Sequence, residues 1–179
     1  FGSAAYNRKK MNRVSCLVPG VMAQTGMESA EIVRGVVKET KPDLVVAVDA
    51  LAAMETKRIC TTIQVTDTGI QPGSGVGNHR AGLTRETLGV PVIAVGIPMV
   101  VYASTIVRDA LKDILAQGST EEAAEAMAER LSKGALREMV VTPRSIDELV
   151  AHLADTLALA INIALQPSFT ARELSFRLH

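Results

Sequence analysis

The residue whose type and position best suit chemistry is Asp49, which directly follows the unbroken apolar run of residues 44–48. Such a run is typical of a central strand that is buried on both faces of a sheet. Open α/β sheets bind ligands in the crevice at the carboxyl ends of their strands, and a carboxylate there can serve as a general acid or base. Asp is also a good helix N-cap, here for residues 50–54. Position alone leaves both interpretations open.

A glycine-rich loop, residues 67–78, holds a second set of candidates. Asp67-Thr-Gly resembles the Asp-Thr-Gly of pepsin-like enzymes, and it also fits a simple turn where a strand enters its loop. The loop has no Gly-Lys-Ser/Thr ending, so it does not match a phosphate-binding loop. Ser74 is flanked by glycines but lacks the Gly-x-Ser-x-Gly pattern of α/β-hydrolases. The loop therefore fits either backbone geometry alone or a substrate cleft lined by backbone N–H groups.

Neither the histidines nor the cysteines predict a metal centre. His79, His152 and His179 have no ligand spacing, so we expect no metal and no cofactor. Cys16 and Cys60 lie inside apolar segments without a partner at ligand spacing, which favours two buried thiols.

Composition limits the class of protein. The 179 residues fit one domain, and 47% apolar with only 3% aromatic residues indicates an aliphatic core. Lys plus Arg equals Asp plus Glu at 19 each, and scarce aromatics disfavour direct nucleic-acid binding. There is no uninterrupted apolar run of about 18 residues, so we expect no membrane partner and a cytoplasmic protein.

The elements that must position these residues alternate along the chain. We expect strands at residues 14–18, 44–48, 58–65, 91–97 and 139–141, with Pro98 closing the fourth. Capping boxes at Thr25 and Glu28, at Ser119 and Glu122, and at Ser145 and Glu148 predict three helix starts, and another helix precedes Gly118. This pattern predicts an α/β fold, a three-layer α/β/α sandwich with a mostly parallel central sheet.

Several phrases, in order along the chain, resemble the spore germination protease family. They are Pro-Gly-Val-Met-Ala-Gln-Thr-Gly-Met-Glu at 19–28, Lys-Pro-Asp-Leu-Val-Val-Ala-Val-Asp-Ala-Leu-Ala at 41–52, Thr-Thr-Ile-Gln at 61–64, all of 67–78, residues 86–98, and Val-Val-Thr-Pro at 140–143. Segment 67–78 is the most distinctive of them.

The resemblance implies an endopeptidase that hydrolyses small acid-soluble spore proteins during germination, in the cytoplasm of the spore core. It implies a fold similar to the hydrogenase maturation proteases, synthesis as a zymogen, and a homo-oligomer, a tetramer. The implied mechanism is of the atypical aspartic type with two essential Asp residues. One matches Asp49; the other lies upstream of the matching region. We therefore expect residues 1–179 to form a single protease core domain that lacks an upstream strand and a propeptide.

Within this reading, Asp67, Ser74 and Asn78 are candidates to line the cleft. Two departures from the family pattern stand out: Tyr102 where an Asp is common, and only residues 118–138 where a long insertion is usual. Two alternatives stay open, a metal-recognising protease of the maturation type and an inactive proteolytic core fragment.

Overall fold

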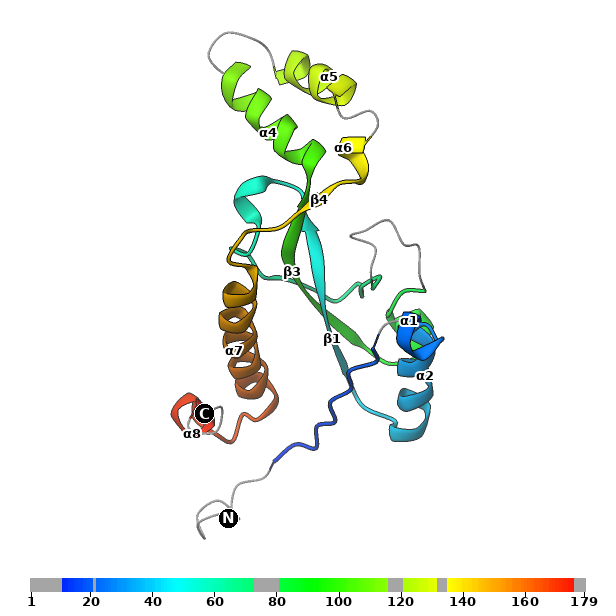
Figure 1. The fold of residues 1–179 in the computed structure, drawn as a ribbon. Coiled ribbons are helices and arrows are strands. Elements are labelled where there is room, and N and C mark those ends of the chain that lie inside the picture. The colour runs from blue at the N-terminus through cyan, green and yellow to red at the C-terminus, as the bar shows by residue number, and fades with distance from the viewer. Residues whose placement is uncertain (1–10, 21, 73–80, 116–120, 132–134, 176–179) are drawn as a thin grey trace. The chain divides into compact units, whose positions relative to one another are not determined.

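The computed structural model describes residues 11–20, 22–72, 81–115, 121–131 and 135–175. By their contacts, residues fall into two compact units. Unit 1 consists of Phe1–Val18 and Ser145–His179, and unit 2 consists of Pro19–Arg144. Figure 1 shows the elements of both.

Unit 2 is built on a small mixed sheet with the strand order β1-β3-β2, to which β4 adds by pairing with β3. The strands are β1 (Val45–Ala53), β2 (Gln64–Thr66), β3 (Val92–Tyr102) and β4 (Val140–Val141). Only β1 and β3 pair in parallel; β2 and β4 are antiparallel to β3. The predicted α/β class is confirmed. The prediction of a mostly parallel sheet is wrong for the part of the chain that the structure describes, because the sheet there is mixed.

Strands β1 and β3 are both longer than expected because Pro98 does not close β3. The predicted central position of the strand before Asp49 is wrong, since β1 lies at the end of the strand order among the described residues. Proline has no N–H to donate to a neighbouring strand, so a sheet accommodates it at an edge or at a bulge. Here the register shifts between Leu51 and Ala52, which pair with Pro98 and Val100, and Met99 is the extra residue. The bulge lets both strands continue, and Pro98 is fully buried.

One face of the sheet carries the core of unit 2. It is covered by α2 (Ser29–Thr40) and α3 (Arg85–Leu88), while the short α1 (Met22–Thr25) precedes α2. The buried cluster consists of Ala30, Ala47, Leu83, Leu88 and Val92, with Val33, Val45, Ile70 and Val90 packed against it. The capping box of α2 is Glu28 with Glu31, one turn later than the predicted box at Thr25.

The remaining helices of unit 2 gather beyond the far end of β3 (Figure 1). They are α4 (Ala103–Leu115), α5 (Glu121–Leu131) and α6 (Ala135–Glu138), and α4 follows β3 without a loop. The 3-10 turn η2 (Thr56–Arg58) follows β1, and of the predicted strand at residues 58–65 only Gln64 and Val65 lie in β2. These helices contact one another more than the sheet faces and do not form a second covering layer.

Unit 1 contains two helices, and two hydrogen bonds join its N-terminal segment to the residue that follows the first of them. Its helices are α7 (Ile146–Leu165) and α8 (Ala171–Ser175), and the last predicted helix is thereby confirmed. The Asn12 N–H donates to Gln166 Oε1 (2.9 Å), and Gln166 Nε2 donates to the Asn12 carbonyl (2.8 Å). Residues 14–18 are exposed and irregular, so the predicted first strand is wrong, and Cys16 is exposed rather than buried.

Among the described residues, α7 is the one helix whose length and apolar composition would suffice to cross a bilayer. Its apolar stretch is interrupted by His152, Asp155 and Asn162. Helices of soluble proteins meet the same criterion, and the expectation of no membrane partner stays a prediction.

Candidate active site

Asp49 lies in the middle of β1 and not at its end. Residues 50–53 continue the strand, so Asp49 is not a helix N-cap, and the prediction of a strand-end position is wrong. Strand side chains alternate between faces, which places Asp49 on the face that also carries Ala47 of the core cluster. The side chain is half-buried, and its Oδ1 accepts a hydrogen bond from the Ala50 N–H at 2.9 Å.

The register sets the neighbours of Asp49 across the sheet. Gly96 of β3 lies opposite Asp49, and Gln64 of β2 lies opposite Gly96. The three residues form one row on one face, with an exposed amide at the far end. A Cβ at Gly96 would lie 2.1 Å from Leu51 Cδ1, so the glycine makes room for Leu51. Asp49 therefore borders an apolar wall, and this row offers no second carboxylate.

The neck of the glycine-rich loop lies on the same face. Ile70 and Leu83 exchange two backbone hydrogen bonds, of 3.0 and 2.7 Å, which close the loop at its base. Both pack in the cluster that contains Ala47, the residue two before Asp49. Thr87 Oγ1 donates to the Gly82 carbonyl (2.7 Å), which ties the neck to α3. The base of the loop therefore lies beside Ala47, the neighbour of Asp49 along the strand on the same face of the sheet.

The structure does not bring Asp67 to Asp49. Asp67 is exposed just after Thr66, and Thr66 is opposite Ala94, whose partner on β1 is Ala47. Two strand spacings, about 9.5 Å, separate β2 from β1. Two carboxyl groups this far apart cannot share a proton. Ser74 and Asn78 lie outside the described residues.

The turn after β1 is fixed to α4 by a polar network. Asp109 accepts hydrogen bonds from the Thr56 N–H (2.7 Å) and from Thr56 Oγ1 (2.6 Å). Arg108 contacts Asp109 at 3.3 Å and donates to the Met54 carbonyl. Burial opposes ionisation of Asp109, but the hydrogen bonds from Thr56 and the Arg108 guanidinium outweigh it and lower the pKa of the carboxyl below its usual value.

This network predicts a pH-dependent stability effect of Asp109→Asn. Hydrogen bonds to a charged group contribute about 1.5–3 kcal/mol when buried, so for this partly exposed carboxylate we expect a loss of about 1–2 kcal/mol at neutral pH. Because the folded pKa is lowered, the stabilisation is present above the ordinary Asp value of about 3.9 and is lost as pH falls through the folded pKa. Urea denaturation at pH 7 and near pH 3 should show the gap between wild type and variant narrowing. A gap of equal size at both pH values contradicts the role of the ionised carboxylate.

Of the two thiols that the sequence analysis expects to be buried, Cys60 is half-buried. Burial raises the pKa of its thiol, which contacts Met99 Sδ at 3.8 Å. Groups of three or more His, Cys, Asp or Glu side chains placed to hold a metal ion are absent from the described parts of the chain.

Tyr102 lies far from Asp49. It ends β3 and pairs with Val140, six residues beyond Gly96, which corresponds to about 20 Å along the strand. An Asp at this position, which the family resemblance leads us to expect, would therefore lie outside the row of Asp49. The short region 118–138 forms α5 and α6 where it is described, next to α4.

Sequence reasoning missed Gly96 and Gln64 as neighbours of Asp49. Gln64 was part of a predicted alternating strand, so the sequence could predict that it lies in a strand and which residues share its face. The sequence could not predict its register against β3, because pairing between distant strands is set by tertiary packing.

Comparison with known proteins gives a consistent result. The family model described as germination protease matches residues 7–137. A germination protease of Caldanaerobacter subterraneus subsp. tengcongensis is 43% identical over 186 residues, covering 95% of this chain and 57% of its own length. The Clostridium acetobutylicum protein of that name is 42% identical over 90% of this chain and 54% of its own length. One from Bacillus velezensis is 61% identical over 102 residues. The chain spans about half the length of the first two relatives.

Proposed function

We propose, since this chain belongs to the germination protease family, that it forms the catalytic core of an endopeptidase that hydrolyses small acid-soluble spore proteins during germination. Asp49 is one of two working carboxylates in this proposal. The observation that carries it is the placement of Asp49 on the face of the sheet from which the loop at residues 71–82 emerges. That loop contains most of the segment most distinctive of the family.

The chemistry is of the aspartic type. Two neighbouring carboxyl groups share one proton because both cannot ionise cheaply at close range. The ionised group takes a proton from water, which attacks the peptide carbonyl; the protonated group polarises that carbonyl and later protonates the leaving amine. The positions beside Asp49 on its face, Ala47, Leu51 and Gly96, carry no carboxylate. As the family resemblance implies, the second carboxylate in this proposal lies upstream of the matching region.

The glycine-rich loop, residues 67–78, lines the substrate cleft beside Asp49 in this proposal, with Asp67, Ser74 and Asn78 as polar contacts. The base of the loop supports this, because Leu83 and Ile70 pack in the cluster that contains Ala47, the neighbour of Asp49 on its face of the sheet. Leu51 supplies an apolar wall on the other side. Such a site suits an extended peptide with backbone groups that pair with loop N–H groups.

The full protein further adopts the three-layer sandwich of the hydrogenase maturation proteases. The sheet face opposite the core cluster supports this, because it exposes Val48 (51%) and Val65 (66%), and an apolar face of this kind requires a cover. Synthesis as a zymogen, assembly into a tetramer and a location in the cytoplasm of the spore core belong to the same proposal, on the strength of the family alone.

The direct test is cleavage of purified acid-soluble spore proteins by the full-length protein, compared with the 179-residue chain under the same conditions. We expect specific endoproteolytic fragments from the full-length protein and none from the chain alone, since one carboxylate of the pair is then missing. Intact mass with N-terminal sequencing fixes which species is assayed. Absence of cleavage by the activated full-length protein would overturn the proposal.

A further inference from the structure

The side chain that occupies the space across the sheet from Asp49 belongs to Leu51. Leu51 lies two residues further along β1 on the same face, and its own partner on β3 is Pro98. A Cβ on Gly96, the residue opposite Asp49, would lie 2.8 Å from Leu51 Cγ and 3.4 Å from Cδ2, and closer still to Cδ1. The Leu51 side chain therefore leans back from its own row and covers the backbone of Gly96.

This arrangement depends on the absence of a side chain at position 96. Neighbouring strands lie about 4.8 Å apart, so a larger residue there would fill the space next to Asp49 with its own side chain. With glycine in place, the methyl groups of Leu51 fill that space. Asp49 and Leu51 are both half-buried, so part of each remains accessible. A molecule that reaches the carboxylate therefore also meets the aliphatic surface of Leu51.

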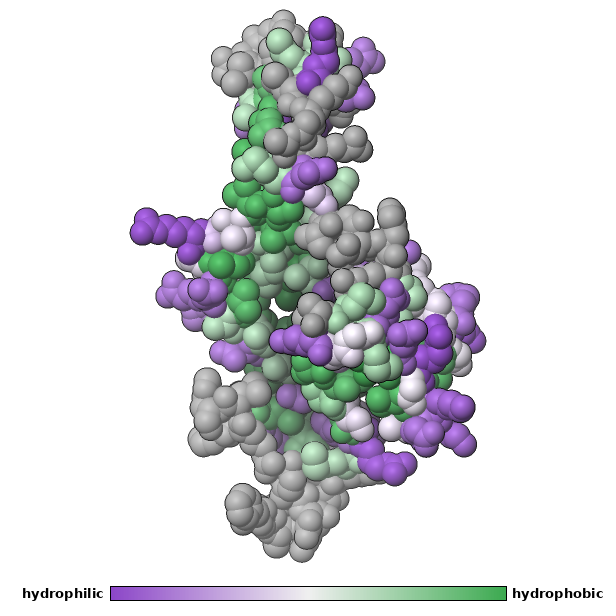
Figure 2. Space-filling model, turned by 45° about the vertical axis from the view of Figure 1, so that its right-hand side comes forward, coloured by the Kyte–Doolittle hydropathy of each residue, from purple (hydrophilic) through white to green (hydrophobic). Residues whose placement is uncertain are grey.

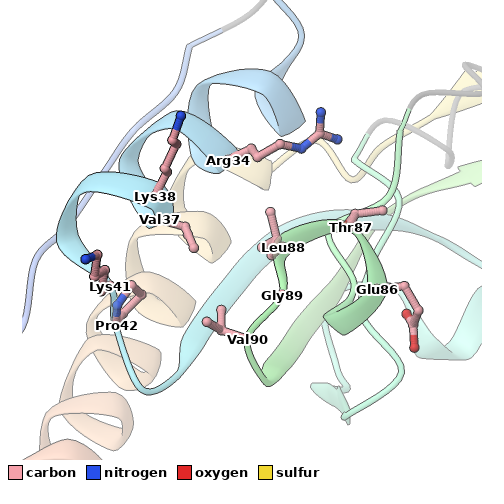
Figure 3. Close-up of a pocket in the computed structure, with 10 residues that line it drawn as sticks. All are labelled: Arg34, Val37, Lys38, Lys41, Pro42, Glu86, Thr87, Leu88, Gly89 and Val90. Atoms are coloured by element: carbon pink, nitrogen blue, oxygen red, sulfur yellow. The ribbon is translucent and has the colours of Figure 1, made fainter.

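A second apolar region of unit 2 does not have this property. Figure 2 shows hydrophobic residues over α2 and α3 ringed by hydrophilic ones, and Figure 3 shows the groove between these elements. Val37 and Leu88 at its base are only 8% and 7% exposed, because they belong to the core of unit 2. That groove leaves little apolar surface for a ligand, whereas Leu51 is half-buried and lies next to a group that can take part in chemistry.

An extended peptide cleaved at Asp49 would place a side chain on Leu51. In the proposed reaction the carbonyl of the cleaved bond lies close to the Asp49 carboxylate, since that group activates the attacking water. An extended chain advances about 3.3 Å per residue, and the position opposite Asp49 is about 4.8 Å away. One of the two residues that flank the cleaved bond therefore lies over Gly96, with the methyl groups of Leu51 beneath its side chain.

We propose that Leu51 is a specificity-determining residue, whose side chain, seated on Gly96, forms the floor of a shallow apolar subsite for one of the two residues that flank the cleaved bond. An aliphatic floor disfavours a charged side chain, which would lose water there without gaining a partner. Because Leu51 fills the space above Gly96, a short apolar side chain such as that of Val fits better than that of Phe. This inference rests on the proposed function, since it assigns a role within that cleavage reaction.

The test is cleavage of a purified acid-soluble spore protein by the activated full-length protein. Mass spectrometry of the fragments identifies the cleaved bond, and each flanking residue of the substrate is then replaced by Val and by Phe. The measured quantity is the ratio of kcat/KM for the Phe substrate to kcat/KM for the Val substrate. We expect Leu51→Ala to raise this ratio about tenfold at one flanking position, the low end of the effect of a misfit in an apolar pocket because the subsite is shallow.

Gly96→Ala provides a partial reversal of that change. In the Leu51→Ala protein, the methyl group added at position 96 lies where the Leu51 side chain lay, so the double variant should return the ratio to within about threefold of the wild-type value. The matched control is Val48→Ala, which shortens an exposed apolar side chain of the same strand on the opposite face and should leave the ratio unchanged. If Leu51→Ala folds too poorly to assay, Leu51→Val should raise the ratio by about threefold.

The ratio compares two substrates with one protein sample, so partial unfolding of a variant lowers both rates and does not change it. An unchanged ratio at both flanking positions, or an equal change from Val48→Ala, would overturn the inference while cleavage by the wild type still supports the proposed function. Absence of cleavage by the wild-type full-length protein would overturn the proposed function and this inference with it.

Discussion

Replacing Asp49 by Asn in the full-length protein is expected to reduce kcat/KM for an acid-soluble spore protein by about a thousandfold. Positioned acid–base groups contribute about 10²- to 10⁴-fold, and an amide can neither take a proton from water nor share one with a second carboxyl group. The change is nearly isosteric. The introduced amide retains an oxygen that can accept the hydrogen bond from the Ala50 N–H, so the strand should keep its geometry.

The matched comparison is Asp67→Asn, which removes a proposed polar contact of the cleft and no acid–base group. Because Asp67 is exposed and displaced from the row of Asp49 along and across the sheet, we expect its loss to raise KM by up to about threefold and to leave kcat unchanged. Rates of fragment formation and thermal melting should be measured for both variants in parallel. A fully active Asp49→Asn protein would exclude the proposed chemistry. An equally large loss at Asp67 would instead assign the chemistry to the glycine-rich loop.

The contrast between these two aspartates shows what residue type and local pattern can predict. The apolar run before Asp49 correctly identified a strand, but the predicted central position is wrong: among the described residues β1 lies at the end of the strand order, and β3 is the central strand. The predicted end of that strand was wrong because Ala50 to Ala53 have no strong preference that marks a continuation. Pairing with β3 extends the strand instead, because residues 97–101 of β3 run alongside Ala50 to Ala53.

Strand ends and sheet pairing are the features that local signals described least well. Pro98 is a strong stop signal in isolation, yet a bulge at Met99 lets β3 run on to Tyr102. Residues 14–18 have the composition of a strand but lie outside the sheet, where they are exposed. Composition states which residues fit a strand; it does not state whether a partner edge is available.

Helices were predicted more accurately because their signals are local. The 20-residue α7 begins one residue after the Ser145 of its predicted capping box. At α2 the true box is shifted by three residues, since Glu28 is the N-cap and the Glu31 side chain accepts a hydrogen bond from its N–H. Thr25 instead ends the short α1, with its Oγ1 accepting from the Met27 N–H.

The neck of the glycine-rich loop leads to the largest stability effect that we expect, in Gly69→Ala. Gly69 has φ +88°, a left-handed conformation that costs an L-residue about 1–2 kcal/mol. An added Cβ would lie 2.3 Å from the Leu83 carbonyl oxygen and 2.9 Å from Thr84 Cα, both of them backbone atoms. Overpacking of this kind adds about 1–3 kcal/mol, so we expect a total loss of about 3 kcal/mol in the free energy of unfolding.

Gly89→Ala separates the two causes, because Gly89 has φ +75° but an added Cβ there meets nothing within 4 Å. It should lose only the conformational part, about 1 kcal/mol. Urea denaturation of both variants measures the difference directly. If the close packing of Gly69 holds the Ile70–Leu83 bridge in place, Gly69→Ala should also lower spore-protein cleavage at temperatures where the variant is still folded, while Gly89→Ala should not. Equal stability losses in the two variants would show that the neck yields to the extra methyl group, and the loop would then not be held rigidly beside Asp49.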